Sequence, residues 1–307
     1  MFRIALATII GLSSSAQAAD WPNWRGPRHD GISRETDWTS DWMASEPKEL
    51  WGVGVGTGFS SLAISDGRAF TAGHNDGQDT VFCLNAETGK LKWKHSYPAP
   101  LVDNLHEGGP AATPTVDEGR VYTLSKDGQL FAFDAAKGEV LWQAHIGELA
   151  DVVMPEWGFS CSALVVGDML ILDAGSTIAL DKHNGKLVWK TERYRPGYGS
   201  ATPCTFDGQS CVAVLNNDAL ILVRTSDGAV LASHPWQTNY ATTSTTPIVQ
   251  GDDIFISSGY QRGCALLRRN DEKFDVVYEN RNMSNHMATC VLHEGHLYGI
   301  DGNSHNA

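Results

Sequence analysis

The chain has 307 residues, of which 42% are hydrophobic and 19% are charged, and this composition is that of a globular protein and not of a disordered one. Its formal net charge of −13 disfavours nucleic acids and anionic membrane surfaces as partners, because both select for clustered lysine and arginine. The 31 glycines recur at intervals along the chain, and this distribution predicts many turns between short strands.

The first 18 residues have the order of a secretory signal peptide. Arg3 precedes an apolar run over residues 4–12, and small residues surround a cleavage site at Ala18. The run is too short for a membrane-spanning helix, which takes about 20 residues. Residue 19 is Ala and not Cys, so the thiol that carries a lipid anchor is missing at the cleavage point. We therefore expect a periplasmic or secreted protein with no membrane span and no lipid anchor.

Two parts are expected in the mature chain: an N-terminal extension over residues 19–50 and a propeller over residues 51–307. Leu50-Trp51 has the pattern of the last strand of a repeat with no earlier strands before it. We therefore expect this strand to complete the last repeat and to close a ring. Glycine alternates over residues 52–58, but the Gly-Lys-Ser/Thr ending of a phosphate loop is missing, so this segment is interpreted as a glycine-rich strand and turn.

An internal repeat is the main feature of the sequence. Residues 85–93 return as residues 134–142 and as residues 181–189, each with a glycine and, four positions later, a tryptophan. A degenerate copy at residues 224–231 lacks the tryptophan. A second repeated element, of the Ala-Thr-Pro type, occurs in phase with these copies. The two elements recur at intervals of 43 to 49 residues. A period of this length with four short strands is typical of one propeller blade.

The second repeat illustrates the expected strands, which cover residues 113–116, 120–125, 129–134 and 139–143 and are separated by glycine-bearing turns. Its apolar side chains are expected to face the adjacent blades: Val121, Leu124, Leu130 and Phe133. Five complete blades are predicted to begin near residues 60, 111, 159, 200 and 243. A sixth has two strands, near residues 288–292 and 297–300. The prediction is an all-β propeller of four-stranded antiparallel blades, about six in number, in a chain that is truncated within the last.

The repeated Asp-Ala-x-Thr-Gly-Lys-x-x-Trp pattern resembles the tryptophan-docking motif of the pyrroloquinoline-quinone-like (PQQ-like) propeller family, which includes quinoprotein alcohol dehydrogenases and the outer-membrane assembly protein BamB. The opening residues 21–27 resemble secreted bacterial members of that family. Each tryptophan is expected to dock on the glycine-bearing turn of a neighbouring blade. The docking residues are Trp51, Gly89, Trp93, Gly138, Trp142, Gly185 and Trp189. Because one fold hosts many activities, this resemblance is specific for the fold alone.

Quinoprotein chemistry implies adjacent bridged cysteines beneath the quinone and carboxylates that hold Ca²⁺. No two of the six cysteines are adjacent, and Glu107, Glu156 and Asp173 are interpreted as solvated acids. His293 and His296 are three positions apart in a predicted hairpin, which is not the helical pair of a zinc protease. We therefore predict no catalytic residue, no metal and no cofactor, and PQQ with Ca²⁺ belongs only to the alternative of a dehydrogenase.

The six cysteines permit disulfides in an exported protein. Cys204 and Cys211 flank Asp207-Gly208, and a two-residue hairpin there would place them opposite each other. The sequence leaves open whether they form a bridge or whether all six are buried thiols, as the surroundings of Cys83 and Cys290 suggest.

Aromatic and imidazole residues precede the expected innermost strands, near the mouth of the central channel. Such a ring would suit a flat ligand, a sugar or a peptide, although the same residues could plug the channel or pack between blades. These candidate ligand-binding residues are Phe59, His106, Trp157, Tyr198, Tyr240 and His286. The sequence favours an exported module that binds or scaffolds a protein, peptide or small ligand in the cell envelope. The alternative is a PQQ-dependent alcohol or sugar dehydrogenase, or an inactive relic of one.

Overall fold

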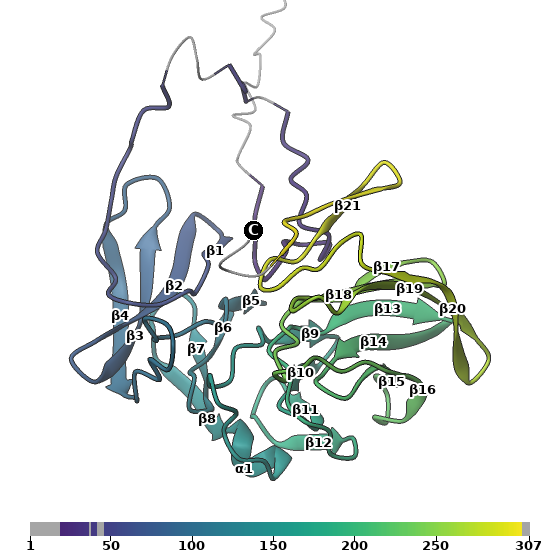
Figure 1. Cartoon of the computed structure of the whole chain (residues 1–307). Coiled ribbons are helices and arrows are strands. Elements are labelled where there is room, and N and C mark those ends of the chain that lie inside the picture. The colour runs from purple at the N-terminus through teal and green to yellow at the C-terminus, as the bar shows by residue number, and fades with distance from the viewer. Residues whose placement is uncertain (1–18, 37, 42–45, 303–307) are drawn as a thin grey trace, which may run out of the picture.

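The structure is a computed structural model that describes residues 19–36, 38–41 and 46–302, so the expected signal peptide lies outside the described residues. Five four-stranded antiparallel sheets and one two-stranded sheet follow one another along the chain. They are arranged around an arc, with the first strand of each sheet toward the middle and the fourth at the periphery (Figure 1). The prediction of an all-β propeller with five complete blades and one incomplete blade is thereby confirmed.

Each four-stranded sheet is a simple meander. The first two sheets contain β1 (Ala63–Ser65), β2 (Arg68–Asn75), β3 (Gln78–Asn85), β4 (Leu91–Pro98), β5 (Thr115–Asp117), β6 (Arg120–Leu124), β7 (Gln129–Asp134) and β8 (Val140–His145). The third and fourth contain β9 (Leu164–Val166), β10 (Met169–Asp173), β11 (Thr177–Asp181), β12 (Leu187–Lys190), β13 (Thr202–Phe206), β14 (Gln209–Leu215), β15 (Ala219–Arg224) and β16 (Val230–Pro235). The last two contain β17 (Ile248–Gln250), β18 (Asp253–Ser258), β19 (Gly263–Asn270), β20 (Lys273–Asn280), β21 (Val291–His293) and β22 (His296–Tyr298).

One short helix, α1 (Ile146–Ala150), follows β8. Over the described ranges no helix is long and apolar enough to cross a membrane.

Tight turns set the register of the hairpins. Asp207 and Gly208 have φ values of 49° and 71°, as a two-residue hairpin turn requires. Cys204 therefore lies directly opposite Cys211, as predicted. All six cysteines are free thiols in this structure, and Cys83 and Cys290 are buried.

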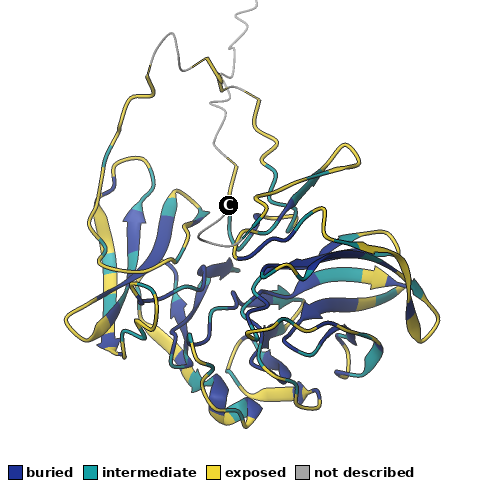
Figure 2. Ribbon diagram, viewed as in Figure 1, coloured by how far each residue is buried: buried dark blue, intermediate teal, exposed yellow. Residues whose placement is uncertain are grey.

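The two middle strands of each sheet carry most of the core (Figure 2). Successive side chains of a strand point to opposite faces of its sheet. Val121 accordingly packs in one cluster with Phe70 of the first sheet, whereas Leu124 packs in another with Leu170 of the third sheet. The expectation that apolar residues of one blade face both neighbours is confirmed.

Tryptophan side chains link consecutive sheets. The ring of Trp93 lies so close to Gly138 that a Cβ atom on that glycine would be 2.6 Å from it. The indole N–H of Trp93 also donates to the carbonyl oxygen of Ala135 at 3.0 Å. The same arrangement recurs for Trp51 on Gly89, Trp142 on Gly185 and Trp189 on Gly228. Each contact combines ring burial with a hydrogen bond, so the repeat motif encodes the interface between blades.

The expectation that Leu50-Trp51 forms a closing strand is wrong. Residues 46–56 contain no strand, although Trp51 docks on the first sheet. A fourth strand needs a third strand as its hydrogen-bond partner, and the last sheet within the described residues consists of β21 and β22 alone.

Residues 20–31, here called the strap, enter the middle of the arc (Figure 1). Trp21 and Ile64 exchange two backbone hydrogen bonds of 2.8 Å, and the amide of Val116 donates to Pro22 at 2.7 Å. The indole N–H of Trp24 donates to Thr246 Oγ1 at 3.0 Å. Arg25 Nη1 donates to the carbonyl oxygen of Cys290 at 2.9 Å. The strap therefore connects the first, second, fifth and two-stranded sheets.

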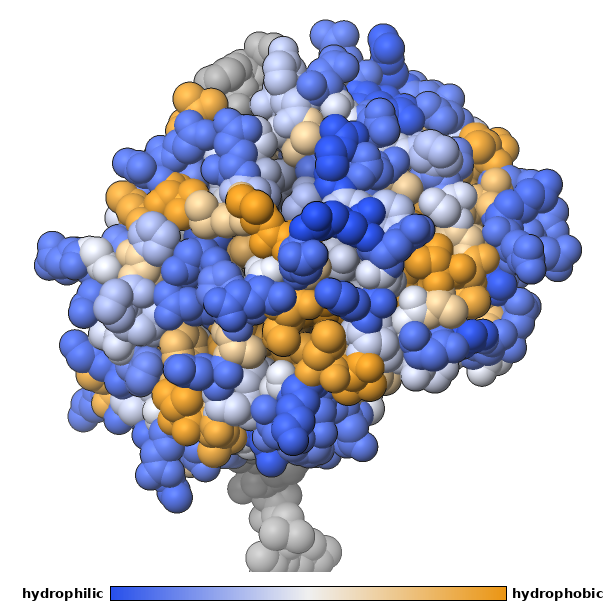
Figure 3. All heavy atoms as spheres, turned by 90° about the horizontal axis from the view of Figure 1, so that it is seen from below, coloured by the Kyte–Doolittle hydropathy of each residue, from blue (hydrophilic) through white to orange (hydrophobic). Residues whose placement is uncertain are grey.

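Exposed apolar side chains are scattered over the periphery. The fourth strands contribute Leu141 of β8 and Val188 of β12, both exposed. On the face seen from below, hydrophobic residues form separate small patches among hydrophilic ones (Figure 3). Patches of this kind are ordinary on a monomeric protein surface.

Candidate functional site

The loops that precede the first strands are hydrogen-bonded to one another and form a continuous edge, here called the rim. The amide of Phe59 donates to Pro110 at 2.8 Å, and that of Tyr198 to Thr243 at 2.8 Å. The hydroxyl of Ser160 donates to the backbone carbonyl oxygen of Tyr198 at 2.9 Å, and the hydroxyl of Ser244 donates to the backbone carbonyl oxygen of His286. All six candidate ligand-binding residues lie along the rim or beside it, but their side chains gather in three separate clusters.

In the first cluster, Phe59 and His106 stack with centroids 5.8 Å apart and an interplanar angle of 3°. His106 Nε2 accepts a hydrogen bond from the ammonium group of Lys126. Burial lowers the pKa of Lys126 to about 8, and burial followed by the Lys126 charge lowers the pKa of His106. The lowered pKa of His106 favours a neutral imidazole beside the lysine.

In the second cluster, Trp157 and Tyr198 pack at 5.6 Å with a tilt of 59°. Burial raises the pKa of Tyr198 to about 12. The phenol is therefore protonated at neutral pH. Both side chains are half-buried and pack against each other.

Asp173 lies at the end of β10 and is buried, so its interpretation as a solvated acid is wrong. Its Oδ1 accepts from the Gly175 amide at 3.2 Å and from the Thr177 hydroxyl at 3.4 Å, but Oδ2 is buried with no partner among the described residues. The physical reason is that β10 is a middle strand covered on both faces. Glu107 and Glu156, in contrast, lie on exposed loops as interpreted.

An Asp173→Asn variant is expected to change how stability depends on pH. Burial raises the pKa of Asp173 to about 6, so the folded state holds this proton more tightly than the unfolded state does. The contribution of Asp173 to the free energy of unfolding is therefore most favourable below about pH 4. It decreases by on the order of 2 kcal/mol as the pH rises to about 6. The variant lacks this proton, so its stability relative to wild type should increase over that window in urea unfolding. A difference that is independent of pH would contradict the burial of an ionisable Asp173.

The third cluster joins two predicted residues to one that the sequence did not single out. Tyr260 lies between Tyr240 and His286, with ring centroids at 4.7 Å and 4.8 Å and edge-on geometry in both pairs. His286 is buried, whereas Tyr240 is 62% exposed. This cluster adjoins a pocket of about 440 Å³, which is lined by Gln237, Thr238, Asn239, Tyr260, Gln261, Arg262, Glu279, Asn280 and Arg281.

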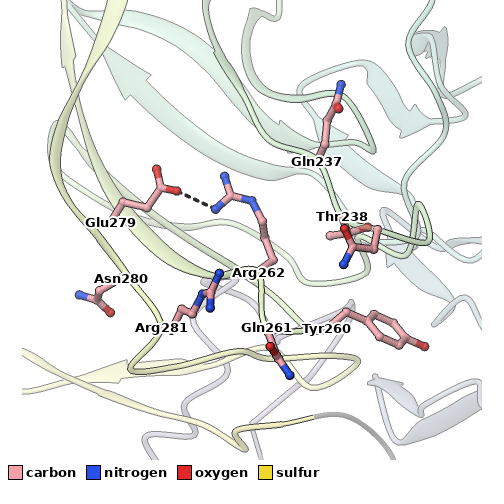
Figure 4. A pocket seen from close by; sticks show the side chains of 9 residues that line it. Gln237, Thr238, Tyr260, Gln261, Arg262, Glu279, Asn280 and Arg281 are labelled. Atoms are coloured by element: carbon pink, nitrogen blue, oxygen red, sulfur yellow. Dashed lines mark hydrogen bonds and ion pairs between the residues drawn. The ribbon is translucent and has the colours of Figure 1, made fainter.

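The wall of this rim pocket is fixed by Arg262, whose guanidinium carbon lies 3.5 Å from the ring centroid of buried Trp236. Arg262 Nη1 also donates to Glu279 Oε1 at 2.7 Å, and Figure 4 shows the two side chains directed toward each other. A stacked, ion-paired guanidinium is held in one orientation. The wall is therefore formed before any ligand arrives.

Sequence reasoning missed Tyr260 and Arg262 because it considered only residues ahead of the first strands. Both lie in the turn between β18 and β19, where Tyr260 and Gln261 have positive φ values of 54° and 59°. The available signal was the length of that turn, residues 259–262, compared with the two-residue turn at Asp76-Gly77 in the first repeat.

The acidic and cysteine side chains near Asp173 are the groups to compare with a calcium-bound quinone site. In the described ranges no three His, Cys, Asp or Glu side chains are placed to hold a metal ion. The thiol of Cys161 donates to the backbone carbonyl oxygen of Asp173 at 3.2 Å, and Cys161 has no cysteine beside it in the sequence. We therefore derive no chemical step through a quinone.

The repeated sheets and their tryptophan contacts define the protein as a β-propeller of PQQ-like repeats. The solved quinohemoprotein alcohol dehydrogenase from Comamonas testosteroni has this fold, with a TM-score of 0.56 at 15% identity over 93% of this chain and 53% of that one.

The chain belongs to the family described as outer membrane protein assembly factor BamB, whose sequence model matches residues 30–172 and 155–306. It is 31% identical to BamB of Vibrio cholerae over 145 residues, which cover 44% of this chain and 33% of that protein. It is 22% identical to polyvinylalcohol dehydrogenase of a Pseudomonas species over 301 residues, which cover 75% of this chain and 46% of that protein. The chain thus spans less than half the length of these two relatives.

Proposed function

We propose that this protein is an exported propeller that acts as a binding or scaffold module in the cell envelope and holds an extended peptide segment of a partner protein at the rim pocket. The observation that carries the proposal is the position of Tyr240, 62% exposed, beside a preformed pocket of about 440 Å³. Membership of a family described as an outer membrane protein assembly factor supports a protein partner in the envelope. The signal-like first 18 residues support export.

The lining of the rim pocket suits a peptide backbone. Each peptide bond presents one donor and one acceptor, and the side-chain amides of Gln237, Asn239 and Gln261 each offer both. Asn280 contributes N–H donors, because its Oδ1 already accepts from the Asn282 amide at 2.9 Å. Tyr240 and Tyr260 add flat apolar surface with polar tips, the kind of side chain that anchors protein interfaces. Because the Arg262 side chain is already held in one orientation, less side-chain entropy is lost when a peptide binds.

The proposal is tested with peptides selected from a random phage-displayed library against the folded mature chain. The affinity of a selected, fluorescently labelled peptide is then measured by anisotropy. Tyr240→Ala and Gln261→Ala are each expected to weaken binding, Tyr240→Ala by about tenfold or more. Tyr298→Ala is the matched control, because Tyr298 is also a surface tyrosine, 58% exposed, but lies on β22 away from the pocket lining.

Two results would overturn the assignment of the rim pocket. One is a library that yields no peptide dependent on Tyr240. The other is an equal loss of affinity in the Tyr298→Ala control, which would indicate nonspecific contact with exposed aromatic rings.

A second candidate, a quinone-dependent dehydrogenase, is favoured by the similarity to polyvinylalcohol dehydrogenase over 75% of this chain. The two candidates differ in a property that can be measured, the binding of free quinone.

A further inference from the structure

A second cavity, of about 220 Å³, lies between the strap and the segments that precede the first strands of three sheets. Its lining comes from the strap on one side and from three hydroxyl residues on the other: Trp21, Asn23, Trp24 and Arg25 face Ser61, Thr113 and Thr289. Because liquid water takes about 30 Å³ per molecule, the cavity has room for roughly seven waters. A ligand of about a dozen non-hydrogen atoms is therefore the largest that matches it.

The hydroxyl side of the cavity offers both donors and acceptors. Thr289 Oγ1 accepts from the Thr246 amide at 3.0 Å, so its own proton remains available to donate. The Thr113 amide donates to Ser162 Oγ at 3.0 Å, which fixes the backbone that carries the Thr113 side chain. Ser61 is exposed beside it. These groups match a ligand whose own groups both donate and accept, as alcohols do.

The guanidinium group of Arg25 donates hydrogen bonds to three backbone carbonyl oxygens. Nε donates to His29 at 3.1 Å, Nη1 to Cys290 at 2.9 Å and Nη2 to Asp30 at 3.0 Å. Each of the three guanidinium nitrogens therefore has a carbonyl partner within the protein. Two of the five guanidinium N–H groups, one on each Nη atom, are left to donate to a ligand oxygen such as that of a hydroxyl group.

The two indole rings of the lining are held in place. The ring of Trp21 packs on Gly26, where a Cβ atom would lie 2.8 Å from it, and the φ of +74° at Gly26 suits glycine. The Trp24 ring is oriented by its bond to Thr246. Fixed flat apolar surfaces beside hydroxyl and amide groups make a small preorganised site.

We propose that this strap cavity binds a small neutral polyhydroxyl ligand, a monosaccharide or a polyol of similar size. The site is separate from the rim pocket, since the two linings share no residue. Ligand binding in the strap cavity can therefore be tested independently of the proposed peptide binding.

The test uses the folded mature chain with D-glucose as the probe and saturation-transfer NMR as the readout. Glucose is expected to bind with a millimolar Kd. Ser61→Ala and Thr113→Val are each expected to weaken binding about fivefold, the loss of roughly one hydrogen bond. Ser60→Ala is the matched control, because Ser60 is the adjacent serine and is not part of the lining; its Kd should equal that of wild type.

Circular dichroism verifies the fold of each variant. If Thr113→Val does not fold, exposed Ser61→Ala still decides the question. No saturation transfer at tens of millimolar glucose would overturn the proposal, as would an equal loss in Ser60→Ala. Binding of acetate without binding of glucose would assign the cavity to anions and would overturn the proposed ligand class.

Discussion

A Gly138→Ala variant is expected to lose about 3 kcal/mol of unfolding free energy in urea denaturation. The φ of Gly138 is 74°, and an added methyl group would lie 2.6 Å from the Trp93 ring. The left-handed backbone accounts for about 1 kcal/mol of the loss. Displacement of a docked indole accounts for about 2 kcal/mol more, as overpacking of a well-packed interior does.

Gly119→Ala separates these two causes. Gly119 belongs to the same sheet and has the same φ of 74°, but nothing lies within 4 Å of the position of its Cβ. Its substitution should therefore cost about 1 kcal/mol, the backbone contribution alone. Equal losses in the two variants would contradict the view that tryptophan docking holds consecutive blades together.

An Arg25→Ala variant is expected to lose about 3 kcal/mol of unfolding free energy and to loosen the two-stranded sheet. Arg25 is 8% exposed, and its removal leaves the buried carbonyl of Cys290 without the guanidinium donor. Hydrogen bonds to a charged group contribute about 1.5 to 3 kcal/mol each. Amide hydrogen exchange over β21 should accelerate more than exchange over β14, to which the described residues of the strap make no backbone hydrogen bond.

Arg28→Ala is the control within the strap. Arg28 is exposed and bonds to the carboxylate of Asp30 and the carbonyl of Ile32. Exposed ion pairs contribute about 0 to 1 kcal/mol, so both stability and exchange should stay close to wild type. A similar effect of both substitutions would show that the strap does not fasten the end of the arc.

The blades could be predicted from the sequence because their contacts are encoded within each repeat. A glycine in one turn and a tryptophan one repeat earlier form the interface, as Gly138 and Trp93 do. The hairpin at Asp207-Gly208 could also be predicted from the sequence, because the turn alone sets the pairing of Cys204 with Cys211. Local periodicity and turn chemistry thus suffice for the fold.

The positions of the strap and of the site residues could not be predicted, because they depend on contacts between residues that are far apart in the sequence. Arg25 meets Cys290 across 265 positions of sequence, and the burial of Asp173 depends on neighbours outside its own hairpin. The aromatic residues of the rim could be predicted from their place ahead of the first strands. Their division into three clusters could not, because Tyr260 completes the third cluster from a different turn.

Titration calorimetry of the folded mature chain with pyrroloquinoline quinone and Ca²⁺, together with a dye-linked alcohol oxidation assay, most directly tests whether this propeller is a binding module. We expect no heat of quinone binding and no turnover from a sample that still binds its selected peptide. Quinone binding at micromolar affinity or tighter, accompanied by turnover, would contradict it and would establish the dehydrogenase instead.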